Sequence, residues 1–249
     1  MATDALRQQV IPRQVRQLNP ASDRFFFSAI IALLWATILF GFAKTYFLAG
    51  MVRAPLPNAL IHIHGAAFTL WMILLVVQEG FIAGRKIRWH KQLGLAGFGL
   101  ASLMVILGVL AANDALRRDA SPPGIDASTF YVVPLSAIVM FAIMVYLAYR
   151  YRFRPADHKR LIIIATINIA GAGIGRWPIA ALQHTPPLQN LVTLTFLLLI
   201  VGYDLISQRR ILKSTLWASL GLMAVQLVRV PIGFTPLWHH FAVFMGGKG

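Results

Sequence analysis

Seven long apolar stretches alternate with short polar connections along almost the whole chain. A helix that crosses the hydrocarbon core of a bilayer needs about 20 mostly apolar residues, and each stretch reaches that length. Backbone N–H and C=O groups find no water inside a bilayer, so each stretch is expected to be α-helical. The pattern predicts spanning helices over residues 25–49, 58–83, 91–113, 128–150, 159–182, 187–207 and 214–233.

The remaining residues complete the predicted organisation. Residues 1–24 are polar and contain arginines, so we expect a cytoplasmic segment rather than a cleaved signal peptide. Residues 25–233 form the transmembrane domain, and 234–249 are too short to span and are expected to lie at the membrane interface. The predicted fold class is therefore all-α, a polytopic membrane bundle of seven transmembrane helices.

Composition supports this assignment and excludes several classes of protein. The chain has 249 residues, of which 58% are hydrophobic and only 12% charged, whereas soluble domains carry about a quarter charged residues. The net charge of +15 is distributed between apolar stretches and not on one soluble face, so nucleic acid is not an expected partner. The absence of cysteine excludes disulfides, thiolate metal sites and cysteine nucleophiles.

The basic residues predict the orientation, because every second connection carries a cluster of them. Cytoplasmic connections of membrane proteins are enriched in Lys and Arg, so we expect the N-terminus in the cytoplasm and the C-terminus outside. The expected location is the bacterial inner membrane, with anionic lipids contacting the cytoplasmic face. Sixteen of the 23 basic residues fall in four clusters, at Arg7/Arg13/Arg16/Arg24, Arg85/Lys86/Arg88/Lys91, Arg150/Arg152/Arg154/Lys159/Arg160 and Arg209/Arg210/Lys213.

Five charged residues lie within the predicted spans and are candidates for function. A charged group in hydrocarbon costs at least about 2.5 kcal/mol, so each needs a partner, water or a ligand. Asp204 is expected to pair with Arg209 of its own turn or with another helix. The five residues are Lys44, Glu79, Arg176, Asp204 and Arg229.

The histidines divide into two sets by depth, estimated from a rise of about 1.5 Å per residue. His90 and His158 each open a helix at the cytoplasmic surface and form the inner set, which is equally consistent with ordinary interfacial histidines. An outer set is expected to cluster near the opposite face. It consists of His62, His64, Arg176, His184, Arg229 and one of His239 and His240.

The second span carries the most regular polar pattern. His64, Trp71, Gln78 and Arg85 recur every seven residues and therefore share one helix face. This stripe predicts an interior-facing surface, although ordinary interhelical hydrogen bonding explains it equally well. In the fifth span, Gly171 and Gly175 form a Gly-x-x-x-Gly motif that predicts close helix packing.

Four motifs are spread over most of the chain, and they are Gly41-Phe42-Ala43-Lys44-Thr45-Tyr46, His62-x-His64-Gly65 through Trp71 to Gln78, His90-Lys91-x-Leu93-Gly94, and His158-Lys159-Arg160-Leu161 leading to Gly175-Arg176-Trp177-Pro178. Together they resemble the motifs of a widespread bacterial family of seven-helix membrane proteins without assigned function. The layout of histidines near both faces is also similar to haem-binding membrane proteins of the cytochrome b561 and haem A synthase kind. The first resemblance implies fold and location, and the second implies haem as a cofactor.

The leading functional hypothesis is a haem-binding or redox-active membrane protein. Haem iron accepts axial imidazoles, and haem propionates pair with arginine. In this interpretation the metal ligands are drawn from His62, His64, His90 and His158, and Arg176 and Arg229 bind the propionates.

Two alternatives stay open. The chain has no soluble domain and no catalytic motif, which fits an accessory or scaffold subunit of a larger, energy-transducing membrane complex with membrane-protein partners. Arg176 and Arg229 also suit a carrier or a lipid- or anion-binding protein. A metal hydrolase is less favoured, because the sequence contains no His-Glu-x-x-His spacing.

Overall fold

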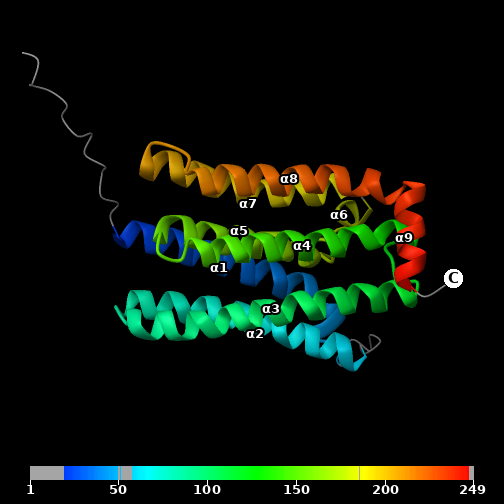
Figure 1. The fold of residues 1–249 in the computed structure, drawn as a ribbon, viewed down its shortest axis with the longest axis horizontal. Helices are drawn as coiled ribbons and strands as arrows, with labels where there is room; N and C mark the ends of the chain where they lie inside the picture. The colour runs from blue at the N-terminus through cyan, green and yellow to red at the C-terminus, as the bar shows by residue number, and fades with distance from the viewer. Residues whose placement is uncertain (1–19, 50, 52–57, 185, 247–249) are drawn as a thin grey trace, which may run out of the picture.

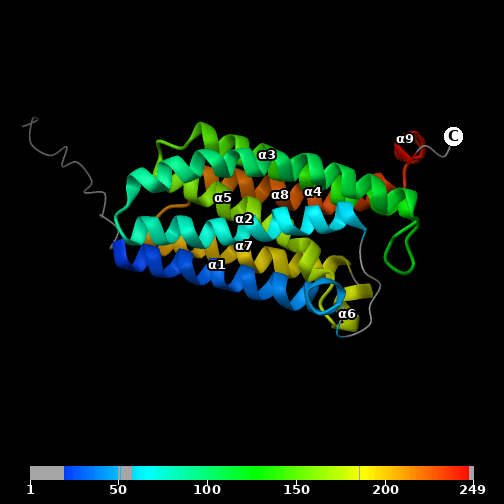
Figure 2. The same ribbon diagram turned by 90° about the horizontal axis from the view of Figure 1, so that it is seen from below.

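Residues 20–49, 51, 58–184 and 186–246 are described by a computed structural model, so most of the predicted segment 1–24 lies outside the described residues. The described chain folds into seven long helices that run up and down side by side (Figures 1 and 2). They are α1 (Pro20–Phe42), α2 (Ala59–Ala83), α3 (Ile87–Arg117), α4 (Ala127–Arg150), α5 (Pro155–Ile174), α7 (Pro186–Gln208) and α8 (Lys213–Gly233). Three shorter elements are η1 (Ala43–Phe47), α6 (Ala180–His184) and α9 (Pro236–Gly246).

Six of the long helices are long and apolar enough to cross a membrane, so the chain is an integral membrane protein with a helical bundle. Large apolar side chains such as Leu70 and Ile106 cover the outward faces of these helices. The remaining long helix, α5, carries Asp157, Lys159 and Arg160 in its first two turns. Every 18-residue window of α5 therefore contains more than two charges.

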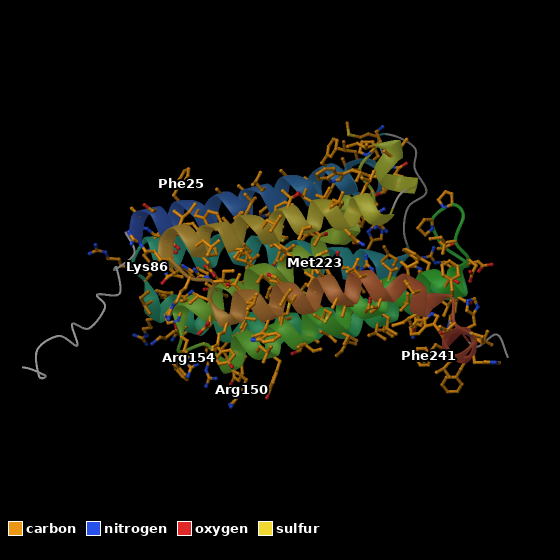
Figure 3. All side chains as sticks on the ribbon, turned by 90° about the horizontal axis from the view of Figure 1, so that it is seen from above. Phe25, Lys86, Arg150, Arg154, Met223 and Phe241 are labelled. Carbon is orange, nitrogen blue, oxygen red and sulfur yellow. The ribbon has the colours of Figure 1, made fainter. Side chains whose placement is uncertain are left out.

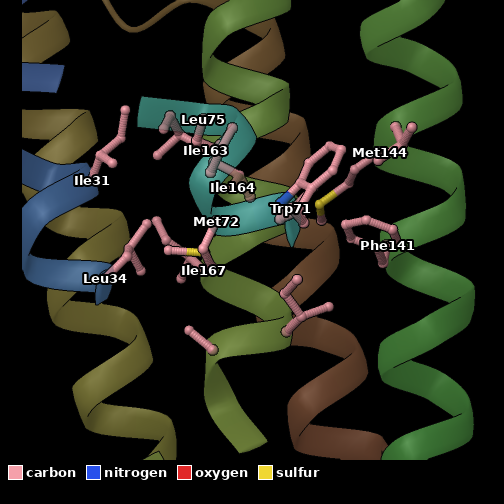
Figure 4. Packing of buried hydrophobic residues seen from close by; sticks show 14 of the residues in the cluster. Ile31, Leu34, Trp71, Met72, Leu75, Phe141, Met144, Ile163, Ile164 and Ile167 are labelled. Carbon is pink, nitrogen blue, oxygen red and sulfur yellow. The ribbon is translucent and has the colours of Figure 1, made fainter. Parts of the chain in front are cut away.

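Helix α5 lies at the centre of the bundle and packs against α1, α4, α7 and α8. Ile164 and Ile167 of α5 are fully buried and belong to one apolar cluster with residues of α1, α2 and α4, including Trp71 and Phe141 (Figure 4). Lipid tails are as apolar as these side chains, so close van der Waals packing, rather than escape from solvent, stabilises the cluster.

Helices α1 and α5 cross closely at two glycines. A Cβ on Gly41 would lie only 2.8 Å from the Cα of Gly173 and closer still to its carbonyl oxygen. The predicted contact at Gly171 is wrong, because no atom outside its own helix turn lies within 4 Å of a Cβ built there. Gly173, two residues further on, faces α1, whereas Gly175 faces the side chain of Gln189 on α7.

The fifth helix ends earlier than predicted. Helix α5 stops at Ile174, and the chain turns through Trp177 and Pro178 before the short helix α6 begins. Proline disfavours helical backbone in the residue that precedes it, so Pro178 accounts for the break. The predicted continuous helix 159–182 is therefore interrupted. Helix α5 ends at Ile174, a turn follows, and the short helix α6 begins at Ala180.

The polar stripe of α2 is used for contacts between helices. Trp71 is 2% exposed and its Nε1 donates to the hydroxyl of Thr166 on α5, 3.1 Å away. The Gln78 amide, in the orientation that satisfies both its polar atoms, accepts from the backbone N–H of Gly94 on α3. The stripe faces the interior as predicted at these positions, whereas Arg85 is exposed in the connection beyond α2.

The bundle has two chemically different ends. The basic end contains the connections 84–86, 151–154 and 209–212, and Figure 3 shows Lys86, Arg150 and Arg154 there. The α9 end contains η1, the connection 118–126, residues 175–184 and helix α9, which lies across the bundle (Figure 1). The predicted interfacial tail thus forms a helix that packs through Trp238 and Ala242 against α3 and α4.

Candidate functional site

A cavity of about 420 Å³ opens at the α9 end, between η1 and the turn that connects α5 to α6. Two positively charged side chains contribute to its wall, and none of its lining residues is acidic. The lining residues are Phe40, Gly41, Ala43, Lys44, Thr45, Arg176, Pro178, Ala180 and Gln183.

A turn of π-helix positions Lys44 in this wall. Helix α1 widens at Ala43–Phe47, where the N–H of Leu48 donates to the carbonyl of Ala43, five residues earlier, at 2.7 Å. Single π-helical turns are rare and frequently occur at functional sites. The close contact between Gly41 and Gly173 brings this turn against the end of α5, so the cavity depends on the α1–α5 crossing.

The end of α5 fixes Arg176 on the opposite wall. Its Nη1 donates to the carbonyl oxygen of Ala172 at 2.8 Å, and its guanidinium lies over the ring of Phe42, 4.8 Å from the centroid. These two contacts hold the side chain in place and leave further guanidinium donors for a ligand, because arginine has five N–H donors.

Among the described residues, no carboxylate pairs with either cation. The whole chain has only eight acidic residues, and those near the α9 end lie in or beside the α3–α4 connection, at Asp114, Asp119 and Asp126. Asp114 pairs with Arg118 at 2.7 Å. Within the described part of the chain, neither Lys44 nor Arg176 forms an ion pair. The cavity therefore presents an uncompensated positive field, which favours an anionic ligand.

Arg229 lies near the same end but on α8. Its Nη2 donates to Asn190 on α7 at 3.5 Å, and its buried Nε has no hydrogen-bond partner. Gln189, the residue before Asn190, packs against Gly175, which precedes Arg176. The two arginines of the predicted outer set thus flank the start of α7, and no described contact joins them directly.

A polar stripe that the sequence analysis did not identify runs along α8. Thr215, Ser219, Gln226 and Arg229 are spaced by four, seven and three residues, so they share a face, and the first three are buried. Ser219 Oγ and Gln226 Oε1 lack hydrogen-bond partners among the residues that the structure describes. Buried polar atoms are normally hydrogen-bonded, so these atoms require water or a ligand. The spacing of these polar residues on one helix face was the signal by which the sequence could have revealed the stripe.

The histidines at the α9 end do not converge on one point. His62 is exposed, and its ring lies 5.6 Å from that of Tyr46. His64 packs on Phe68 with ring centroids 4.2 Å apart, and among the described residues its buried Nδ1 has no hydrogen-bond partner. Neither histidine lines the cavity.

The other outer histidines have separate surroundings. His239 lies 3.0 Å from the hydroxyl of Thr129, through Nε2, where α9 contacts α4. His240 is exposed, and the side chain of His184 lies outside the described residues. The predicted outer set is consequently dispersed along the α9 end.

The inner histidines both lie at the basic end, in the first turns of α3 and α5. His158 Nδ1 hydrogen-bonds to the carbonyl of Ala148 at 3.0 Å, and His90 Nδ1 accepts from the amide of Gln78. The described residues contain no group of three or more His, Asp or Glu side chains that could hold a metal ion.

A buried ion pair connects three helices near the basic end. Arg160 and Asp204 are 0% exposed, and Nε of Arg160 donates to Oδ1 of Asp204 at 2.7 Å. The other carboxylate oxygen accepts from the backbone N–H of Leu212 at 3.1 Å and the hydroxyl of Thr215 at 2.6 Å. The carboxylate thus lies at the N-terminus of α8, which favours negative charge. Asp204 therefore pairs with a residue of another helix, which is one of the two alternatives that we predicted for it.

A second polar contact lies beside this pair. Lys159 forms an ion pair with Asp23 of α1, and Asp23 also accepts from the hydroxyl of Tyr203 on α7 at 3.0 Å. Along the sequence, Lys159 and Arg160 belong to a basic cluster that predicts topology and to one of the four motifs, and neither pattern predicts these contacts. Each charged residue of the two ion pairs has a partner on another helix. The ion pairs therefore connect helices and leave few charged groups free to bind a ligand.

No family model matches the chain, and no curated protein or solved structure is significantly similar to it. The geometry and chemistry of the cavity therefore carry the functional interpretation.

Proposed function

We propose that this membrane protein binds a small anion, or an anionic group of a larger molecule, in the cavity at the α9 end. The observation that carries this proposal is the convergence of Lys44 and Arg176 on one cavity that no carboxylate lines. Unpaired charges near a membrane interior are costly, and they are found where a ligand or an ion pathway requires them.

The chemistry of the cavity indicates the class of anion. Arginine presents a planar fork that binds carboxylate or phosphate through two parallel hydrogen bonds, and lysine adds a mobile point charge. The hydroxyl of Thr45 adds a neutral donor. The volume of about 420 Å³ lies at the small end of the range of about 300–1,000 Å³ typical of ligand sites. A compact carboxylate or phosphate compound fits these properties.

The polar stripe of α8 supports a carrier rather than a surface receptor. Gln226 and Ser219 offer unpaired polar atoms inside the bundle, and Arg229 lies at the end of the stripe that is nearer the start of α7. A bound anion that left the cavity toward the interior would meet the Arg229 guanidinium and the Ser219 hydroxyl, which can donate hydrogen bonds, whereas the unpaired Oε1 of Gln226 only accepts them. In this proposal Arg176 binds the anion in the cavity, and Arg229 binds it next, at the end of the α8 stripe.

We further propose that the chain crosses a bacterial inner membrane seven times, with its N-terminus in the cytoplasm. Helix α5 counts as the additional span because it is packed between four other long helices. Its charges at Lys159 and Arg160 are paired with acidic residues, which lowers the cost of placing them at membrane depth. The cavity then opens to the outside, and the basic end faces the cytoplasm.

Haem binding and a scaffold role remain predictions with less support. His158 donates through Nδ1–H to the backbone carbonyl of Ala148, the arrangement that leaves Nε2 available to a metal. In contrast, His90 accepts through Nδ1, so the proton of the neutral ring lies on Nε2. A Soret band in the absorption spectrum of protein purified from haem-replete membranes would favour haem over the anion proposal.

The proposal is tested by titrating detergent-purified protein with inorganic phosphate, sulfate and glycerol phosphate in a calorimeter. We expect at least one of these probes to bind, and Arg176→Gln or Lys44→Gln to weaken binding by about tenfold or more, because a hydrogen bond to a charged group contributes about 1.5–3 kcal/mol. Arg117→Gln removes an exposed charge from the same end outside the cavity and is the matched control. Equal loss in all three variants would refute the site.

A further inference from the structure

A second hollow lies at the opposite end of the bundle and has a different character. It is a groove of about 800 Å³ between α4, α5, α8 and the connection from α7 to α8. Ile143 and Trp217, on its rim, are 46% and 69% exposed. The groove is therefore open on the side of the bundle that faces lipid, and the exposed indole is typical of a residue at the membrane interface.

The mouth of the groove is basic. Arg154, Arg210 and Lys213 line it, and none of them forms an ion pair within the described ranges of the chain. The one acidic residue in the lining, Asp157, accepts a hydrogen bond of 2.6 Å from the hydroxyl of Ser214. Three cations and one carboxylate leave the mouth with a net positive charge that suits an anionic group.

The wall on α8 becomes apolar with depth. Lys213, Trp217 and Gly221 recur every four residues on one face of α8, and all three line the groove. Eight residues of helix correspond to about 12 Å. A charged mouth, an aromatic interfacial belt and an apolar depth thus follow one another along the membrane normal.

The opposite wall on α4 repeats this order. Tyr151 and Leu147 lie near the mouth, and Met144 and Met140 lie deeper, where the methyl end of Met140 is 3.8 Å from a Cβ built on Gly221. From Tyr151 to Met140 the helix rises about 17 Å. The absent side chain at Gly221 keeps the deep part of the groove open, and flexible methionines suit a variable apolar occupant.

We infer that this groove is a binding site for one anionic phospholipid of the leaflet at the basic end. Its head-group phosphate would lie among Arg154, Arg210 and Lys213, and an acyl chain would extend along the apolar wall toward Gly221. Free phosphate would use only the mouth and would leave the apolar depth unfilled. The inference does not depend on the cavity at the α9 end, which lies at the other end of the bundle.

The experiment compares lipids retained by the purified full-length protein in native mass spectrometry, after incorporation into bilayers that contain equal amounts of phosphatidylglycerol and phosphatidylcholine. We expect one phosphatidylglycerol to be retained with about tenfold preference or more, because each basic residue near the surface contributes about 1 kcal/mol. The combined substitution Arg154→Gln, Arg210→Gln and Lys213→Gln should abolish the preference.

Two further variants separate a defined site from general surface charge. The combined substitution Arg85→Gln, Lys86→Gln and Arg88→Gln removes three exposed charges from the same end, outside the groove, and should leave the preference intact. Gly221→Leu fills the apolar depth without a change of charge and should abolish retention. Circular dichroism melting curves verify that each variant is folded.

Three results would overturn the inference. The first is equal loss in the two charge variants, which would show delocalised attraction of lipid. The second is unchanged retention in Gly221→Leu. The third is full displacement of the lipid by equimolar glycerophosphoglycerol, the soluble head group, which would show that a free anion suffices.

Discussion

At the scale of single residues, the fully buried ion pair of Arg160 and Asp204 has a structural role. Arg160 and Asp204 satisfy each other across α5 and α7, and Asp204 also holds the first turn of α8. Removing one partner of a buried pair leaves a bare charge and costs about 3–5 kcal/mol, whereas replacing both with apolar residues is often neutral. The pair therefore fixes the relative position of the three helices more than it adds to their stability.

This distinction gives a testable prediction. Arg160→Met should lower the free energy of unfolding in detergent by about 3–5 kcal/mol, because Asp204 would be left buried without a cation. The double variant Arg160→Met with Asp204→Leu should recover most of the loss. Arg209→Met, at an exposed position of the same end, is the control. Chemical denaturation followed by circular dichroism measures all four proteins, and equal stability of wild type and Arg160→Met would refute the assignment.

A second prediction concerns pH. Thr129, through its side chain and then its backbone N–H, holds the pKa of the Asp126 carboxyl, which caps α4, below its ordinary value of 3.8. A depressed folded-state pKa stabilises the fold above the ordinary pKa, and the contribution disappears as pH falls through the depressed value. Asp126→Asn keeps a capping side chain that does not titrate.

Melting temperatures measured from about pH 6 down to about pH 3, across the ordinary pKa of Asp, check this prediction. Wild type should lose more stability than Asp126→Asn over that range. Parallel pH profiles of the two proteins would show that the cap does not contribute through its charge.

Single residues also show where sequence reasoning succeeds and where it fails. Arg176, Arg229 and Asp204 stood out because a charge inside an apolar stretch is conspicuous. Arg160 did not stand out, because it belongs to a basic cluster that topology already explained. The partner of each charge comes from a distant helix, as with Asp204 and Arg160, and spacing along one chain does not reveal which helices become neighbours.

At the scale of elements, the crossing of α1 and α5 determines whether the cavity exists. Gly41 lines the cavity and touches the backbone of Gly173. Backbone atoms cannot move aside as the end of a flexible side chain can, so a methyl group at Gly41 must push the helices apart. The π-helical turn that carries Lys44 would move with α1.

Gly41→Ala should therefore destabilise the protein by about 1–3 kcal/mol, as overpacking usually does, and should also weaken anion binding. Gly171→Ala is the matched control, because a Cβ there meets no atom within 4 Å. The control should be neutral or slightly stabilising, since alanine favours helix over glycine by about 1 kcal/mol. Thermal melting and phosphate titration of both variants measure the two effects, and identical behaviour would contradict the assigned crossing.

The elements were predicted from sequence to an unequal degree. Long apolar stretches predicted all seven long helices of the described chain, because length and hydropathy alone suffice for that inference. The π-helical turn at Ala43–Phe47 and the break after Ile174 were not predicted. Both depend on local backbone geometry, and Pro178 was the only sequence signal for either. Of the two glycines in the Gly-x-x-x-Gly motif, Gly175 lies close to Gln189 of α7 as predicted, whereas Gly171 makes no close contact and Gly173 packs against α1 instead.

At the scale of the whole molecule, charge divides the bundle into two functional halves. The basic end combines paired charges inside the bundle with a groove at its surface that we propose to bind lipid. The α9 end has few basic residues in its connections, so Lys44 and Arg176 stand apart from the charges that set topology. The central claim is that these two residues make the cavity attractive to anions that approach from outside.

A cysteine at Thr45 tests this claim most directly, because the chain has no other cysteine and Thr45 lines the cavity. Intact cells that express Thr45→Cys are treated with membrane-impermeant methanethiosulfonates, one anionic and one cationic. We expect the anionic reagent to react at least about tenfold faster, because a charged cleft concentrates opposite ions by that order or more. The ratio should approach one when Arg176→Gln and Lys44→Gln are added, and Ser121→Cys, at the same end, should show no preference. Reaction of Thr45→Cys only after the cells are permeabilised, or at equal rates with both reagents, would contradict the account.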